Sequence, residues 1–244
     1  MTAGQIAIVT LGALSGGFVS GLAGFGTGLT AIGIWLHALP PGTMASLVVV
    51  CSVVSQLQTI PGIWHAIQPK RVLPFIIPGL IGVPFGTRLL TYLDPNAFRF
   101  GMGVLLLCFS TVSLVAGAGL KVRWGGRIAD GIVGLAGGLL GGLAGLSGPM
   151  PTMWAAIRGW RKDERRGVFQ AFNLSILLAA LLSYALTGHL TADVGRALIA
   201  ALPGTLAGAW LGSCVYRRLS DRHFHNTILI LLAFSGLTLL WAGW

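Results

Sequence analysis

Apolar residues along the chain form long runs, and the charged residues fall mainly in the short stretches between them. A helix that crosses a bilayer needs about 20 predominantly apolar residues, and most of these runs have that length. The pattern predicts an all-α integral membrane protein. Eight apolar segments are expected, at residues 4–36, 43–65, 71–91, 97–119, 128–157, 167–187, 194–216 and 224–243.

The first and fifth of these segments are too long for one crossing, and a glycine-rich string interrupts each near its middle. Residues 16–24 read "GGFVSGLAG" and residues 137–145 read "GGLLGGLAG", which match without a gap. Glycine inside a helix weakens the helix, so this composition needs a structural reason. A hairpin that turns at the glycines supplies one.

The same comparison predicts an internal duplication. The pair Pro78 and Gly79 in the third segment is matched by Pro203 and Gly204 in the seventh. We therefore expect an N-terminal repeat at 1–120 and a C-terminal repeat at 128–244. The basic stretch "KVRWGGR" at 121–127 joins them.

The distribution of basic residues predicts how the segments cross. If all eight crossed, the 16 Lys and Arg residues would divide 6 to 10 between the two sides, which gives no clear orientation. If the fifth segment turns back as a re-entrant hairpin, thirteen share one side, as the excess of Lys and Arg in cytoplasmic loops requires. The three on the other side are then Arg88, Arg99 and Arg196. The N-terminal region has no Lys or Arg that would orient the first segment, and only the duplication predicts a hairpin there too.

Each repeat would then contain a re-entrant hairpin and three transmembrane helices. An odd number of crossings inverts the second repeat relative to the first, so the two repeats would have opposite orientations. Both chain ends would lie on the periplasmic side of a bacterial inner membrane. The two hairpins would enter from opposite faces, and their tips would meet near the bilayer midplane.

We expect a substrate-binding site at these tips. Backbone that leaves helical geometry inside a membrane is tolerated where it lines a cavity or is packed in protein. A new half-helix begins after each tip, with Thr27 or Gly26 as a predicted N-cap in one and Ser147, followed by Pro149, in the other. Helix N-termini attract anions. The predicted binding residues are Gly24, Phe25, Gly26, Thr27, Gly28, Gly145, Leu146, Ser147, Gly148, Gln56, Gln170 and Asn173.

Other interpretations of these residues are open. GxxxG pairs such as Gly17 and Gly21, or Gly138 and Gly142, serve close helix packing in many membrane proteins. The amides of Gln170 and Asn173 can donate to an oxyanion without the cost of burying a charge, and they can equally join two helices.

Composition excludes several classes of function. Charged residues make up only 9% of the chain and hydrophobic residues 55%, which rules out a soluble domain. The formal charge of +10 resides in loops, so nucleic-acid binding is not expected. None of the six acidic residues lies at the centre of a predicted crossing, which disfavours a proton relay. Motifs of hydrolases and nucleotide-binding enzymes are missing, and the three cysteines lack metal or disulfide spacing. We expect neither an enzyme nor a cofactor.

Two further stretches, together with the repeated glycine string, carry a family resemblance. They are "QPKRVLPFIIPGLIGVPFGTRLL" at 68–90 and "GPMPTMWAAIRGWRKDERRGVFQAFN" at 148–173. With these motifs the chain resembles the TauE/SafE sulfite-exporter family over essentially its whole length. The resemblance implies a permease of the bacterial inner membrane that moves sulfite, sulfonates such as sulfoacetate, or other sulfur oxyanions. It implies family motifs around Gly24, Gly145 and residues 170–173 without fixing the substrate.

The resulting hypothesis is export of sulfite or a related anion by alternating access. With a negative cell interior, each negative charge that leaves gains about 2.3 kcal/mol per 100 mV, so export needs no coupling ion. One alternative is a cation-coupled importer of sulfonate or thiosulfate, and a more distant one is a membrane scaffold. The expected partners are a small sulfur oxyanion and the lipid bilayer. The oligomeric state stays open, with a homodimer as one option.

Overall fold

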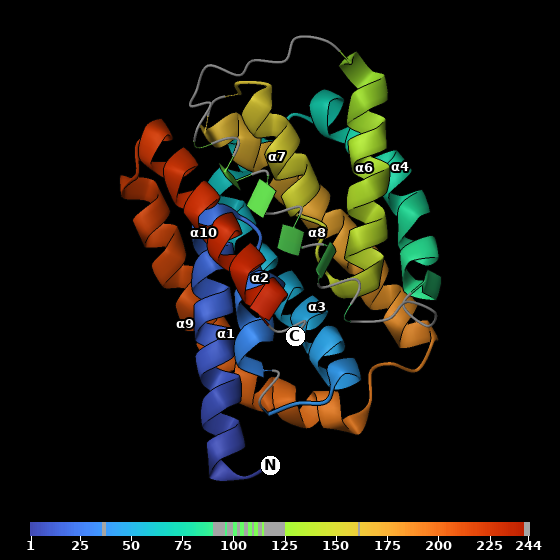
Figure 1. The fold of residues 1–244 in the computed structure, drawn as a ribbon, viewed down its shortest axis with the longest axis vertical. Coiled ribbons are helices and arrows are strands. Elements are labelled where there is room, and N and C mark those ends of the chain that lie inside the picture. Colours follow the sequence, from blue (N-terminus) through green and yellow to red (C-terminus); the bar gives the residue numbers. More distant parts are fainter. Residues whose placement is uncertain are drawn as a thin grey trace.

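The computed structural model describes residues 1–35, 38–89, 125–160 and 162–241, with ten scattered residues between 96 and 114. In this part of the chain the regular structure is helical, without a strand (Figure 1). The predicted crossing at 97–119 lies outside the described residues apart from the scattered ones. Residues 121–124 of the predicted linker also lie outside them.

The first apolar segment folds as a helical hairpin. Helix α1 (Ala3–Ala23) ends at Gly24, whose φ of 82° is left-handed and therefore favours glycine, and α2 begins at Thr27 (Thr27–Trp35). Helix α2 runs back along α1, because the indole Nε1 of Trp35 donates to the carbonyl of Val9 at 3.0 Å. We call residues 24–28 the first tip.

The fifth segment forms a second hairpin. Helix α6 (Gly126–Ala144) ends at Gly145 with a φ of 68°, and α7 (Pro149–Ile157) follows. Helix α7 also turns back, since Trp154 Nε1 donates to the carboxylate of Asp130 near the start of α6, at 2.6 Å. The predicted break at the duplicated glycine string is thus confirmed in both segments. We call residues 145–148 the second tip.

The remaining described helices correspond to predicted crossings. They are α3 (Pro41–Thr59) with the short 3-10 helix η1 (Ile60–Ala66), α4 (Pro69–Leu89), α8 (Lys162–Leu186), α9 (Ala192–Arg218) and α10 (Asp221–Trp241). Within the described ranges, five helical stretches are long and apolar enough to span a bilayer. They are Ala3–Ala23, Gly42–Ala66, Pro69–Leu89, Asp163–Leu186 and Ala192–Arg218.

Two glycine-lined helix pairs hold the hairpins in place. Helix α1 packs against α9, and α6 packs against α4. A Cβ atom added at Gly21 would lie 2.2 Å from the carbonyl oxygen of Ala209, and one added at Gly142 would lie 2.2 Å from that of Val83. Such backbone-to-backbone approach is possible only without a side chain. The packing interpretation of these GxxxG pairs is confirmed.

The contacts of one pair recur in the other. Gly17 of α1 lies against Thr205 of α9, and the matching glycine of α6, Gly138, lies against Gly79 of α4. By this register the counterpart of Gly79 is Thr205, so the predicted match to Gly204 is one residue off. Helices α1 and α6 run in opposite directions in Figure 1.

Candidate anion site at the first hairpin tip

The two tips touch, and apolar side chains fill the space between them. A Cβ atom at Gly148 would lie 2.4 Å from the Cβ of Phe25, and one at Gly28 would lie 3.4 Å from Leu146. Phe25 also meets Phe169 edge-on, with ring centroids 5.8 Å apart. We call Phe25, Leu146 and Phe169, all buried, the apolar plug. The structure thus places two of the predicted binding residues in an apolar contact.

The tips touch side by side and are offset along α8. Gly24 lies against Phe169, whereas Gly145 lies against Leu177. These two contacts are eight residues apart on α8, about 12 Å at 1.5 Å per residue. The start of α8 therefore lies closer to the first tip than to the second.

Three predicted polar residues surround the first tip. The amide of Gln56 donates to the carbonyl of Gly24 at 2.7 Å, and that of Gln170 donates to the hydroxyl of Thr59. Thr27 is the first residue of α2, and its buried hydroxyl has no hydrogen-bond partner among the described residues. Gln56 and Gln170 thus satisfy polar groups at the point where α1 ends.

A buried arginine completes this environment. Arg166 is only 1% exposed, and its guanidinium donates to the carbonyls of Gly21 at 2.7 Å and Leu22 at 3.3 Å. Its Nε donates to the side chain of Gln170 at 3.1 Å, and the group lies 3.7 Å from the ring centroid of Tyr216. Carbonyls at a helix C-terminus lack partners and carry the negative end of the helix dipole. Arg166 therefore caps α1 with a positive charge.

The second tip has neutral polar contacts only among the bonds the structure describes. The hydroxyl of Ser147 bonds to the side chain of Asn173. The carbonyl of Gly142 accepts from the hydroxyls of Thr87 and Tyr184, each at 3.4 Å. The prediction of Ser147 as an N-cap is wrong, because its hydroxyl is used by Asn173 and α7 begins two residues later at Pro149.

A cavity of about 110 Å³ lies beside the first tip. Two cationic side chains, Arg166 and Arg217, line it together with hydroxyl groups from three other residues. Its volume equals that of a few water molecules at roughly 30 Å³ each, which suits a small oxyanion. The lining residues are Gln58, Thr59, Gly62, Ile63, Arg166, Trp210, Ser213, Tyr216 and Arg217.

None of the twelve predicted binding residues lines this cavity. Gln170 is connected to it, because it hydrogen-bonds both Arg166 and Thr59. Sequence reasoning missed Arg166 because it assigned the residue to the charged loop before a helix expected at 167–187. Helix α8 begins at Lys162 and includes it. The signal was present, since Arg166, Gln170 and Asn173 recur at the spacing of one helix face.

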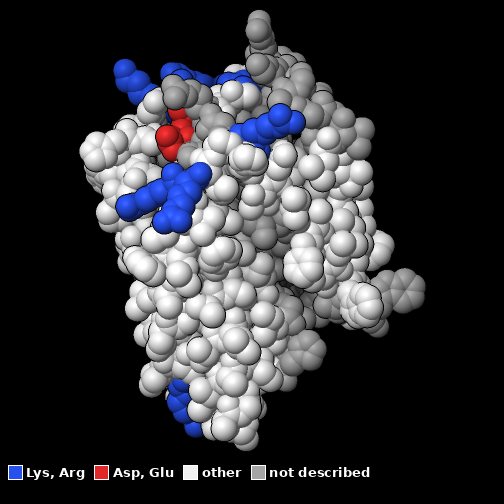
Figure 2. Space-filling view, turned by 90° about the vertical axis from the view of Figure 1, so that its left-hand side faces the viewer, with Lys and Arg blue, Asp and Glu red and all other residues white. Residues whose placement is uncertain are grey.

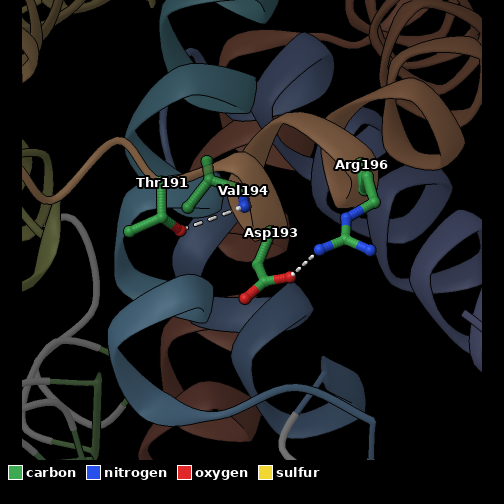
Figure 3. A network of polar contacts seen from close by, with 4 residues as sticks. All are labelled: Thr191, Asp193, Val194 and Arg196. Carbon is green, nitrogen blue, oxygen red and sulfur yellow. Dashed lines mark hydrogen bonds and ion pairs between the residues drawn. The ribbon is translucent and has the colours of Figure 1, made fainter.

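The cavity lies at the basic end of the molecule. Figure 2 shows Lys and Arg side chains gathered at one end, with a smaller basic group at the other. A second cavity, of about 330 Å³, is lined by Lys70, Arg71, Arg127 and Arg158. Arg127 is at the start of α6 and Arg158 follows α7, so the second hairpin begins and ends at the same end. The opposite end contains Arg196, which forms an ion pair with Asp193 at 2.7 Å (Figure 3).

This fold and cavity define a class of protein: a multi-pass helical membrane protein with a cationic cavity beside a broken helix. Comparison with protein families gives the particular assignment. The family model described as "Sulfite exporter TauE/SafE" matches residues 8–239. The chain belongs to this family, which is a family of transporters and not of enzymes. Comparisons with curated proteins and with solved structures give no match.

Proposed function

We propose that the protein exports sulfite, or a related sulfur oxyanion or organosulfonate, from the bacterial cytoplasm by alternating access. One observation carries this proposal: a buried guanidinium, that of Arg166, lines a small cavity together with Arg217. The guanidinium of Arg166 carries five N–H groups, of which three donate to Gly21, Leu22 and Gln170, and Tyr216 interacts with the same group. Charge-assisted hydrogen bonds to an oxyanion are about twice as strong as neutral ones.

The architecture proposed for this activity is a pair of inverted repeats, at 1–120 and 128–244. Its support is that the glycine contacts between α1 and α9 match those between α6 and α4, while α1 and α6 run in opposite directions. The hairpin tips would be the re-entrant elements of each repeat. Rocking of one repeat against the other would move the tips relative to each other.

The apolar plug is proposed as the barrier that the anion passes during this movement. It separates the cavity at Arg166 from the Ser147–Asn173 pair at the second tip. An anion held at Arg166 and Gln170 would be released toward Ser147 and Asn173 when the tips slide apart. The predicted midplane site between the half-helix N-termini would exist only in that second arrangement.

The proposed orientation places the basic end in the cytoplasm of the cell and both chain ends in the periplasm. It follows from the excess of Lys and Arg at one end of the molecule. A reporter fused before Met1 and another fused after Trp244 should both be active only in the periplasm. Cytoplasmic activity of the N-terminal fusion would contradict the orientation.

The central experiment measures sulfite flux in proteoliposomes of the full-length protein. A membrane potential, negative on the side from which sulfite leaves, should drive flux without a sodium or proton gradient. Each charge moved gains about 2.3 kcal/mol per 100 mV. Arg218→Gln is a suitable control, because it removes a basic residue of α9 that does not line the cavity.

The same assay separates the alternatives. Flux that requires a cation gradient would replace export by the coupled importer of sulfonate or thiosulfate. A scaffold would give no flux with any sulfur oxyanion, and neither sulfite nor thiosulfate would raise its melting temperature. Parallel trials with sulfite, sulfate, thiosulfate, taurine and sulfoacetate would identify the substrate.

A further inference from the structure

A second basic cavity lies away from the hairpin tips, where α4 and α6 begin. Lys70, Arg71 and Pro74 of α4 line it together with Arg127 and Asp130 of α6. Arg158 and Trp160, which follow α7, complete the lining. Its volume of about 330 Å³ falls in the range of pockets that hold small organic molecules. It is three times the volume of the cavity at Arg166.

The basic side chains that line this cavity favour an anionic ligand. Four basic side chains face one acid, Asp130, and its carboxylate accepts from Trp154 Nε1 at 2.6 Å. Arg71 is paired with Glu164 at 3.4 Å. Lys70 and Arg127 form no ion pair within the described part of the chain. The four basic residues thus meet two acids, Asp130 in the lining and Glu164 beside Arg71, and Lys70 and Arg127 keep a net positive charge at the cavity.

The helices themselves add to this field. Phe75 contacts Gly134 and Gly79 contacts Gly138, so α4 and α6 run parallel, side by side, from the same end. Two helix N-termini with their positive dipole ends thus lie at the cavity.

Exposed apolar side chains extend away from the cavity on both helices. On α4, Leu73, Ile77 and Ile81 recur every four residues, and each is 49% exposed or more. On α6, Ile128 and Ile132 are 80% and 64% exposed. These surfaces are suited to contact with acyl chains, whereas a small free anion would not contact them.

We propose that this cavity binds the phosphodiester headgroup of an anionic phospholipid, such as phosphatidylglycerol, with its acyl chains along α4 and α6. Basic pockets between transmembrane helices are suited to such headgroups. The proposal is independent of the transported substrate. Lys70 and Arg127 supply the charge, and the apolar stripes distinguish a lipid from a soluble phosphate.

The test is native mass spectrometry of the full-length protein in detergent, titrated with phosphatidylglycerol or phosphatidylcholine. The wild type should bind phosphatidylglycerol preferentially. The double variant K70Q/R127Q should bind it roughly 10- to 30-fold more weakly, because each basic residue near the surface contributes about 1 kcal/mol. The charge-conserving variant K70R/R127K should retain binding.

A matched control is R218Q/R222Q, which removes two charges at the end of α9 and the start of α10, outside the cavity. Its affinity for phosphatidylglycerol should stay within about twofold of the wild type. Equal losses in the two glutamine variants would overturn the proposal in favour of general surface attraction. Competition by inorganic phosphate at millimolar concentration, with equal thermal stabilisation, would also overturn it, because the occupant would then be a free anion. Size-exclusion chromatography confirms that each variant is folded.

Discussion

The two hairpin tips have similar backbone conformations, and they differ in the groups that donate to the carbonyls before each tip. Gly21 before the first tip and Gly142 before the second occupy equivalent places in the glycine register. The Gly142 carbonyl accepts from the neutral hydroxyls of Thr87 and Tyr184, whereas the Gly21 carbonyl accepts from the guanidinium of Arg166 at 2.7 Å in addition to the neutral hydroxyl of Ser213 at 3.5 Å.

This difference separates structural need from function. Both tips must satisfy carbonyls inside a membrane, where an unpaired polar group costs several kcal/mol. The second tip shows that neutral donors are sufficient for this task. The positive charge at the first tip therefore exceeds what capping requires, which supports the proposal that the adjacent cavity binds an anion.

The largest effect is expected when this charge is removed and hydrogen-bond donors are kept. Arg166→Gln retains amide donors near the Gly21 and Leu22 carbonyls but carries no charge. Sulfite flux should fall roughly 10- to 100-fold, the equivalent of one charged hydrogen bond of about 1.5–3 kcal/mol. Proteoliposome flux measures the effect, and size-exclusion chromatography reports folding.

The matched control lies at the second tip. Tyr184→Phe removes a neutral donor from the equivalent carbonyl and should change flux by about twofold at most. Equal losses in the two variants would show that the charge has no special role. Arg166→Lys keeps the charge without the planar fork of donors and should give intermediate flux.

The glycine contacts should prove equivalent in the two hairpins. Gly21→Ala and Gly142→Ala each force a Cβ atom to 2.2 Å from a backbone oxygen, which cannot move aside as a flexible side chain would. Each should lower the free energy of unfolding by about 1–3 kcal/mol, measured by denaturation in detergent. Costs that differ several-fold between the two would refute the structural equivalence of the hairpins.

The apolar plug should govern leakage more than stability. Phe25→Leu keeps most of the buried volume, so its cost in unfolding free energy should be under about 1.5 kcal/mol. The smaller side chain leaves a gap beside Gly148, and passive flux of chloride through the protein should rise. Leu11→Ala, on an exposed position of α1, is the control and should not leak. An unchanged chloride flux in Phe25→Leu would argue against the plug as a barrier.

A smaller effect on flux than at Arg166 is expected at the Ser147–Asn173 pair. Ser147→Ala removes one neutral hydrogen bond, of about 0.5–1.5 kcal/mol, so flux should fall roughly two- to tenfold. Measured sulfite release into the medium should slow, while sulfite-induced thermal stabilisation of the purified protein should persist. A loss of that stabilisation would place the first binding step at the second tip instead.

The backbone of this site was predictable from the sequence, but its charge was not. The overlong segments and the repeated glycines predict breaks at Gly24 and Gly145, because local chain geometry determines them. Arg166 is absent from the predicted site because positive-inside counting assigns every arginine near a segment boundary to a loop. Helix α8 starts five residues before the predicted start at 167 and includes it. The insertion of Phe25 against Gly148 depends on how two distant segments pack, and no local pattern encodes it.

The contact between Phe25 and Gly148 is a position at which one substitution could shift the protein to another conformation. A methyl group at position 148 would stand 2.4 Å from the Cβ and 2.7 Å from the Cγ of Phe25, so neither ring nor backbone could stay in place. Gly148→Ala should therefore disfavour the conformation described here and populate a different arrangement of the hairpins. If the proposed alternating access is correct, a single added carbon would make its second conformation accessible to structure determination.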